Sequence, residues 1–177
     1  NCVSTVTVQD TVSPNAVCQD LTIFLDGAGS ATITTGDADN GSADACGIDT
    51  RSLSQATFTC SDIGANNETL TVTDGEANTD SCITMVTVRD TIVPVAICQD
   101  ATVSLDATGN ITLVSSDIDN GSSDICGFSS FVISPSAFNC STTGPNNVTM
   151  TVTDNDGNTA SCTCLLYTSP SPRDSMT

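Results

Sequence analysis

The sequence contains no histidine, no lysine and no tryptophan, and it has a single tyrosine. Because histidine and lysine are the usual general bases, a serine nucleophile would have no ordinary partner here. Paired carboxylates would be the remaining route to acid–base catalysis. Such a pair needs a cleft, and the short repeated module described below leaves little room for one. We therefore predict that the chain is not an enzyme and has no catalytic residue.

Basic residues are also scarce. Lysine plus arginine number 3 against 21 aspartate plus glutamate, which gives a formal net charge of −18. Binding to a nucleic-acid backbone requires a basic face, and anionic membrane surfaces repel an acidic chain. We expect no nucleic-acid partner and no membrane insertion. The charge either keeps a secreted protein soluble or supplies carboxylates for calcium.

A repeat organises the chain. The stretch DADNGSADACG, Asp37 to Gly47, returns 80 residues later as DIDNGSSDICG, Asp117 to Gly127. This period is too long for a solenoid unit and fits one small globular module per repeat. We predict four segments: the last strand of a preceding repeat (1–10), a first module (11–90), a second module truncated before its last strand (91–163), and a tail (164–177).

The predicted tail breaks the repeat. It begins as CLLYTSPSPRD at Cys164, where the first module has Thr84 and an alternating strand pattern. This stretch resembles the translation of a sequencing-library adapter, read through at the end of a DNA fragment. We therefore expect residues 164–177 to be non-native and disordered.

Short alternating segments predict an all-β fold. Apolar side chains alternate with polar ones from Val3 to Val8, from Leu21 to Leu25 and from Thr69 to Thr73, as half-buried strands require. Turn residues separate such segments every eight to twelve positions, and no helical period is present. The pattern predicts tandem immunoglobulin-like β-sandwich modules.

Cysteine is the expected staple for modules this small. Four cysteines per module without histidine favour disulfides over zinc, and disulfides place the protein in an oxidising, extracellular setting. Four cysteines allow three pairings. Because the first and last strands of such a sandwich lie side by side, we pair the cysteines on these strands and then the two that remain. The expected bonds are Cys18 with Cys82, Cys46 with Cys60, Cys98 with Cys162, and Cys126 with Cys140.

The repeated acidic loop is a candidate calcium site. Each copy places three carboxylates within one loop, as the hard Ca²⁺ ion requires. The candidate ligands are Asp37, Asp39 and Asp44, with Asp117, Asp119 and Asp124 in the second module. Glycine at the fifth loop position and Ile48 at the twelfth exclude an EF-hand. The alternative is that these residues make Asx-turns and bind no ion.

Several of these positions together resemble a known family. They are Asp10, Pro14, Cys18, Asp39 to Ser42, Gly64, Thr69 to Asp74, Asn78, Cys82, Val86 to Val88 and Asp90. The pattern is similar to hyalin-repeat (HYR) modules, especially the cysteine-containing tandem repeats of large secreted or cell-surface proteins of Bacteroidota. This chain departs from the family in having Gln19 in place of a proline, no tryptophan in the second strand, and the extra pair Cys46 and Cys60.

The resemblance implies an immunoglobulin-like fold and a role in adhesion or spacing. We therefore expect a structural or adhesive segment of a large extracellular protein. Its expected partners are neighbouring repeats of the same chain, surface glycans or other proteins. The alternative is a ligand-binding accessory module of a secreted enzyme, bound to carbohydrate or another ligand. Carbohydrate binding usually uses exposed aromatic rings, which are few here.

Overall fold

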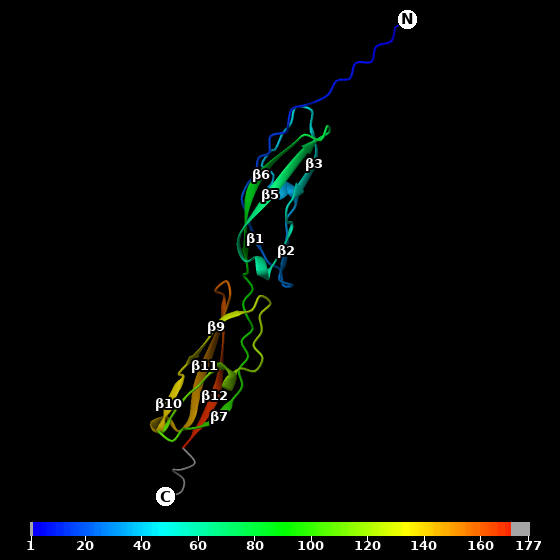
Figure 1. Ribbon diagram of the computed structural model, residues 1–177. Helices are drawn as coiled ribbons and strands as arrows, with labels where there is room; N and C mark the ends of the chain where they lie inside the picture. Colours follow the sequence, from blue (N-terminus) through cyan, green and yellow to red (C-terminus); the bar gives the residue numbers. More distant parts are fainter. Residues whose placement is uncertain (1, 171–177) are drawn as a thin grey trace. The chain divides into compact units, whose positions relative to one another are not determined.

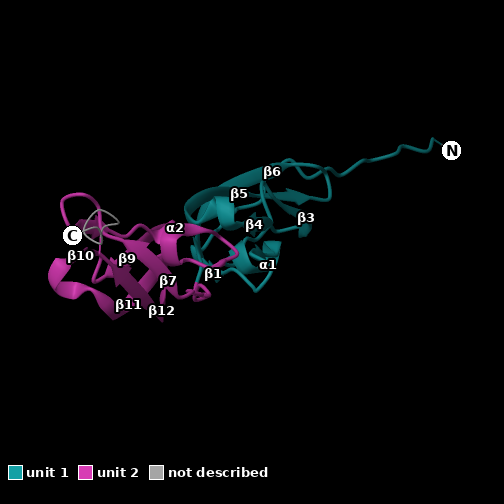
Figure 2. Ribbon diagram, turned by 90° about the horizontal axis from the view of Figure 1, so that it is seen from below, with its two compact units in different colours: residues 1–90 teal, residues 91–177 magenta. Residues whose placement is uncertain are grey.

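The computed structural model describes residues 2–170 of the chain. Two compact units are present, Asn1–Asp90 and Thr91–Thr177 (Figure 2). Each unit is an immunoglobulin-like β-sandwich, which confirms the predicted fold class. We describe each unit by itself.

Unit 1 packs a four-stranded sheet against a two-stranded one (Figure 1). The larger sheet has the order β1-β6-β5-β3 and the smaller one pairs β2 with β4. The elements in chain order are β1 (Leu21–Phe24), β2 (Ser30–Thr32), α1 (Thr35–Ala38), β3 (Ile48–Leu53), β4 (Thr57–Thr59), the 3-10 turn η1 (Cys60–Asp62), β5 (Gly64–Asp74) and β6 (Thr79–Arg89).

The core of unit 1 follows from the alternation along its two long strands. Leu70 and Val72 on β5 and Val86 and Val88 on β6 are fully buried, and Phe58 of β4 covers them from the smaller sheet. β5 and β6 pair antiparallel over their whole length, whereas β1 joins β6 in parallel. The first strand of the module therefore lies beside its last strand, as predicted.

Unit 2 repeats this plan 80 residues later. Its larger sheet has the order β7-β12-β11-β9 and its smaller one pairs β8 with β10. The elements are β7 (Ala101–Ser104), β8 (Asn110–Thr112), α2 (Ser115–Ile118), β9 (Phe128–Ser134), β10 (Ala137–Asn139), η2 (Cys140–Thr142), β11 (Gly144–Asp154) and β12 (Thr159–Ser169).

The expected truncation of the second module is wrong. β12 runs to Ser169 and pairs with both β11 and β7. Cys164, Leu166 and Thr168 alternate inward and are buried, occupying the places of Thr84, Val86 and Val88 in unit 1. An alternating segment of any origin completes the sheet if its inward side chains are small or apolar. The rest of the predicted tail, residues 171–177, lies outside the described residues.

The predicted strand from Val3 to Val8 is not formed. These residues have no ladder partner, and Val3, Val6 and Val8 are 83–91% exposed. Alternation alone does not make a strand, because the backbone also needs a neighbouring edge for its hydrogen bonds. Among the described residues, no strand pairs with this segment. The same part of the chain contains no helix that could cross a membrane.

Candidate functional site

Unit 1 gathers acidic side chains at one of its two ends. The entry end, as we call it, holds Asp10 and the turn between β5 and β6; the exit end holds η1 and the end of β6. At the entry end the possible ligand atoms of Asp10, Asp44 and Cys46 lie within 4.8 Å of one another, and so do those of Asp10, Asp74 and Glu76. We call these five residues the entry-end cluster.

The fold brings the cluster together from three separate segments. Asp74 ends β5 and Glu76 lies in the following turn, while Asp44 and Cys46 close the loop before β3. Because Ile48 pairs with Asp74, the end of that loop comes to the same level as the turn. Asp10 is fixed from the other side, since the Asn78 side-chain amide donates to its backbone carbonyl at 3.3 Å.

Asp74 is the rigid member of the entry-end cluster. It is 2% exposed, and its Oδ1 accepts the backbone N–H groups of Glu76 at 3.0 Å and Asn78 at 2.8 Å. Its Oδ2 accepts from the Asn78 side chain at 2.7 Å. These bonds make an Asx-type turn, so burial of this carboxylate is fully compensated.

Asp10 is different because one of its oxygens has no such compensation. Its Oδ1 accepts the Val12 N–H at 2.9 Å. Its Oδ2 is buried and accepts no N–H or O–H hydrogen bond from the described residues. A buried carboxylate oxygen in this condition carries a desolvation cost that a cation would remove.

The electrostatics around Cys46 follow from the same carboxylate. The hydrogen bond from the Val12 N–H lowers the pKa of Asp10, and the neighbouring Cys46 thiol lowers it further. In return, contact with the Asp10 carboxylate and its negative charge raise the pKa of Cys46, and Asp44 and Glu76 add to this effect. The raised pKa lowers the fraction of Cys46 that is present as the reactive thiolate.

Unit 2 repeats two of these carboxylates. Asp154 is 1% exposed and accepts the N–H groups of Asp156 at 2.9 Å and Asn158 at 2.8 Å, as Asp74 does in unit 1. Asp124 accepts the Cys126 N–H at 2.8 Å with Oδ2, whereas its Oδ1 is buried without a hydrogen-bond partner. The carboxylate arrangement is thus a property of the module.

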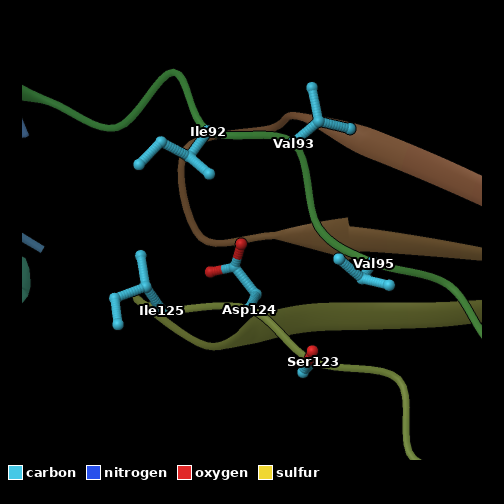
Figure 3. Close-up of a pocket in the computed structure, with 6 residues that line it drawn as sticks. All are labelled: Ile92, Val93, Val95, Ser123, Asp124 and Ile125. Carbon is cyan, nitrogen blue, oxygen red and sulfur yellow. The ribbon is translucent and has the colours of Figure 1, made fainter. Parts of the chain in front are cut away.

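Asp124 also lines an open pocket within unit 2. Figure 3 shows its carboxylate among the apolar side chains of Ile92 and Ile125. The lining residues are Ile92, Val93, Val95, Ser123, Asp124 and Ile125. These six lining residues include no aromatic ring on which a sugar could stack.

The predicted ligands Asp37 and Asp39 have other structural tasks. Asp37 caps α1, because its Oδ2 accepts the backbone N–H of Thr34 at 2.6 Å and the Thr34 hydroxyl at 2.7 Å, and this bonding lowers its pKa. Asp39 accepts the Ser42 N–H at 2.9 Å and forms an ion pair with Arg51 at 3.2 Å. Burial raises the pKa of Asp39, but the bonds from Ser42 and Arg51 outweigh it and lower the pKa.

The second copy of the loop behaves in the same way. Asp117 accepts the Val114 N–H at 2.8 Å at the start of α2, and Asp119 accepts the Ser122 N–H at 3.1 Å. Of each predicted trio, only the third member, Asp44 or Asp124, points to the entry end. The loop carboxylates are therefore not gathered into one ligand set among the described residues.

Sequence reasoning did not include Asp10, Asp74 and Glu76 among the candidate ligands. A signal was present, since the repeat places Asp90, Asp154 and Asp156 at the equivalent positions. What could not be seen without the fold is that the turn after β5 meets the segment before the first strand.

Two of the predicted disulfides are formed and two are not. Cys18 bonds to Cys82 and Cys98 to Cys162, each with a sequence separation of 64. Cys46 and Cys140 carry exposed free thiols, so the pairs Cys46–Cys60 and Cys126–Cys140 are absent. The reason is distance. Cys46 lies at the entry end and Cys60 at the exit end, at opposite ends of the 11-residue β5, which spans about 35 Å.

Comparison with known proteins identifies no family. No family model and no curated protein match the chain. A solved structure of protocadherin gamma B7, extracellular cadherin domains 1–4, is 12% identical over 89% of this chain and 51% of that chain, with a TM-score of 0.40. The chain thus spans about half the length of that solved protein.

Two further solved structures show the same range of likeness. Human protocadherin-24 EC1-2 is 9% identical, covering 90% of this chain and 100% of that chain with a TM-score of 0.40. The fibronectin(III)-like modules of Clostridium thermocellum CbhA are 15% identical, covering 93% and 83% with a TM-score of 0.32. With TM-scores below 0.5, these likenesses carry no argument about the function of this chain.

Proposed function

We propose that this chain is a structural and adhesive segment, a stalk or spacer, of a large extracellular protein of the HYR-like kind, and that it performs no catalysis. The observation that carries the proposal is the bond between Cys18 and Cys82, repeated as Cys98 and Cys162. Each bond joins the segment entering a module to the last strand leaving it. Tension applied along the chain is then borne by a covalent bond.

The mechanical consequence is large. A module has roughly 80 residues between Asp10 and Asp90, and the bond encloses a separation of 64. About 16 residues remain that force can extend, equivalent to at most about 6 nm, against about 27 nm for the whole module. In a spacer with these bonds, the extension of each module stays limited even after its sheets have unfolded.

Single-molecule stretching of the intact chain tests the proposal. Each unfolded module of the oxidised chain should extend to no more than about 6 nm, and the same module in reductant should extend to about 27 nm. Equal lengthening with and without reductant would refute the mechanical role. Binding of a single module to a glycan array would instead support the alternative of a ligand-binding accessory module.

We also propose that calcium binds at the entry-end cluster and stabilises the module. The specific observation is the buried Oδ2 of Asp10, beside the carboxylates of Asp44, Asp74 and Glu76. Ca²⁺ prefers several hard oxygen ligands of this kind. We propose this set in place of Asp37 and Asp39, because neither of them belongs to an acidic group among the described residues.

Thermal unfolding in calcium and in chelator tests this second proposal. Calcium at a hundredfold over its dissociation constant should add about 2.7 kcal/mol. Asp10→Asn should abolish the calcium-dependent rise in stability. The matched control Asp37→Asn, from the loop, should be less stable without calcium but should still show this rise. An unchanged response in Asp10→Asn would exclude the cluster as the calcium site.

A further inference from the structure

The open pocket of unit 2 is built by two segments that the backbone holds side by side. The N–H of Val95 donates to the carbonyl oxygen of Ser123 at 2.8 Å, and the N–H of Ser123 donates back to Val95 at 2.9 Å. The walls are aliphatic, and Val93, Val95 and Ile125 are 49–55% exposed. The pocket has a volume of about 270 Å³. This is slightly less than the roughly 300–1,000 Å³ of pockets for drug-sized ligands, so the pocket suits a single side chain.

The walls of this pocket distinguish unit 2 from unit 1. At three of the lining positions unit 2 has a large aliphatic residue where unit 1 has a smaller or polar one. These residues are Val93, Val95 and Ile125, which correspond to Ser13, Asn15 and Ala45. Exposed aliphatic side chains that gather in one place are typical of a binding surface.

A carboxylate without a partner cation lies against these walls. The Asp124 Oδ2 accepts the Cys126 N–H at 2.8 Å, whereas its Oδ1 is buried and has no hydrogen-bond partner among the described residues. A carboxylate oxygen of Asp154 lies within 4.8 Å and adds a second negative charge. Residues 91–170 contain no lysine, arginine or histidine. A cation that neutralises Asp124 therefore has to come from outside this part of the chain.

The lining side chains decide which cation fits. Ca²⁺ takes about six to eight oxygen ligands, and the lining side chains offer only the Asp124 carboxylate and the Ser123 hydroxyl. A lysine side chain matches better, because its aliphatic stem packs on apolar walls while its ammonium group stays near the charge. Arginine fits less well, because a guanidinium binds a carboxylate as a two-oxygen fork. Here one Asp124 oxygen already accepts the Cys126 N–H and the other is buried.

We propose that this pocket binds a lysine side chain presented by an exposed segment of a partner protein. The stem contacts the walls formed by Val93, Val95 and Ile125, and the ammonium group lies beside the Asp124 carboxylate. The lysine does not come from residues 1–177 of a second copy, which contain none. The formal net charge of −18 favours the approach of a basic segment. The pocket is separate from the entry-end cluster of unit 1, so it does not depend on the calcium proposal.

Titration of the intact, disulfide-bonded chain with a lysine peptide tests the pocket. The probe is a blocked alanine-lysine-alanine tripeptide, added in a chelator that removes calcium. We expect saturable shifts of the methyl NMR signals of Val93, Val95 and Ile125. Asp124→Asn, which keeps an oxygen to accept the Cys126 N–H, should weaken binding about fivefold, the upper range for partly exposed ion pairs. Ile125→Ala, which introduces the residue of unit 1, should weaken it by a similar factor.

Matched controls assign the effect to the pocket and to its charge. Asp44→Asn, the equivalent change in unit 1, should leave the titration unchanged, and the methyl signals of Leu166 report whether each variant is folded. The same tripeptide with norleucine keeps an apolar stem without the ammonium group and should bind about fivefold more weakly. Equal binding of the two peptides, an unchanged affinity in folded Asp124→Asn, or no saturation up to about 10 mM peptide would each overturn the proposal.

Discussion

Removal of the Cys18–Cys82 bond is the perturbation whose effect the structure predicts most directly. The bond joins the segment before β1 to β6, and both cysteines are only half-buried. The double variant Cys18→Ala/Cys82→Ala therefore loses little packing. Its main effect is on the unfolded chain, which gains the freedom of a 64-residue loop.

The size of the effect follows from the loop. In the chain-entropy model a closed loop of this length stabilises the folded state by about 4 kcal/mol at 25 °C. That is a large share of the 5–15 kcal/mol typical of a whole domain. For a module of about 80 residues it corresponds to a fall in Tm of roughly 15–30 °C.

Urea unfolding of the full chain measures the loss against an internal reference. Unit 2 keeps its own bond between Cys98 and Cys162, with the same sequence separation, so its transition should not move. Cys46→Ser, which removes a free thiol of unit 1, is the matched control and should leave both transitions in place. A loss below about 1 kcal/mol in the double variant would refute the loop argument.

Two further predictions concern the last strand and the acid response. Leu166→Ala should lower the unfolding free energy of unit 2 by about 2–5 kcal/mol, measured by urea unfolding, because Leu166 is fully buried on β12. The control Tyr167→Ala should cost far less, because Tyr167 is half-exposed. Equal effects would contradict the assignment of β12 as a core strand. The Asp80 carboxylate accepts the Ala16 N–H at 2.8 Å, which lowers its pKa below the usual 3.8. A carboxylate whose pKa is lowered in the folded state stabilises the fold at pH values above its unfolded-state pKa. This stabilisation is lost as the pH falls through the folded-state pKa. The advantage of unit 1 over its Asp80→Asn variant should therefore be constant above about pH 5 and shrink below about pH 4, and unit 2, with Ala160 at this position, provides the reference.

The sequence was sufficient for the parts of the fold that depend on local pattern. Alternation along the segment from Thr69 to Thr73 and the 80-residue period predicted long strands in two equivalent sandwiches, because burial of every second side chain is a property of the strand itself. The bond between Cys18 and Cys82 was also predictable, for a reason of topology. It depends only on the first and last strands being neighbours, which the sandwich topology requires.

The ends of the module were not predictable in this way. Cys46 was paired with Cys60 because these two remained after Cys18 and Cys82, but the intervening β3 and β4 carry the chain from one end of β5 to the other. The calcium ligands of the acidic loop were likewise predicted from sequence position alone. Adjacent carboxylates such as Asp37 and Asp39 satisfy the backbone of their own turn, so their oxygens are engaged before any ion arrives.

One residue that the fold brings to a module end has unused bonding capacity. The Oδ2 of Asp10 accepts no N–H or O–H hydrogen bond from the described residues. Within a module, strands and turns satisfy most buried polar groups locally, because an unsatisfied buried group costs stability. A cation is the partner whose chemistry fits this carboxylate oxygen, which is why the calcium proposal concerns an end of the sandwich and not its faces.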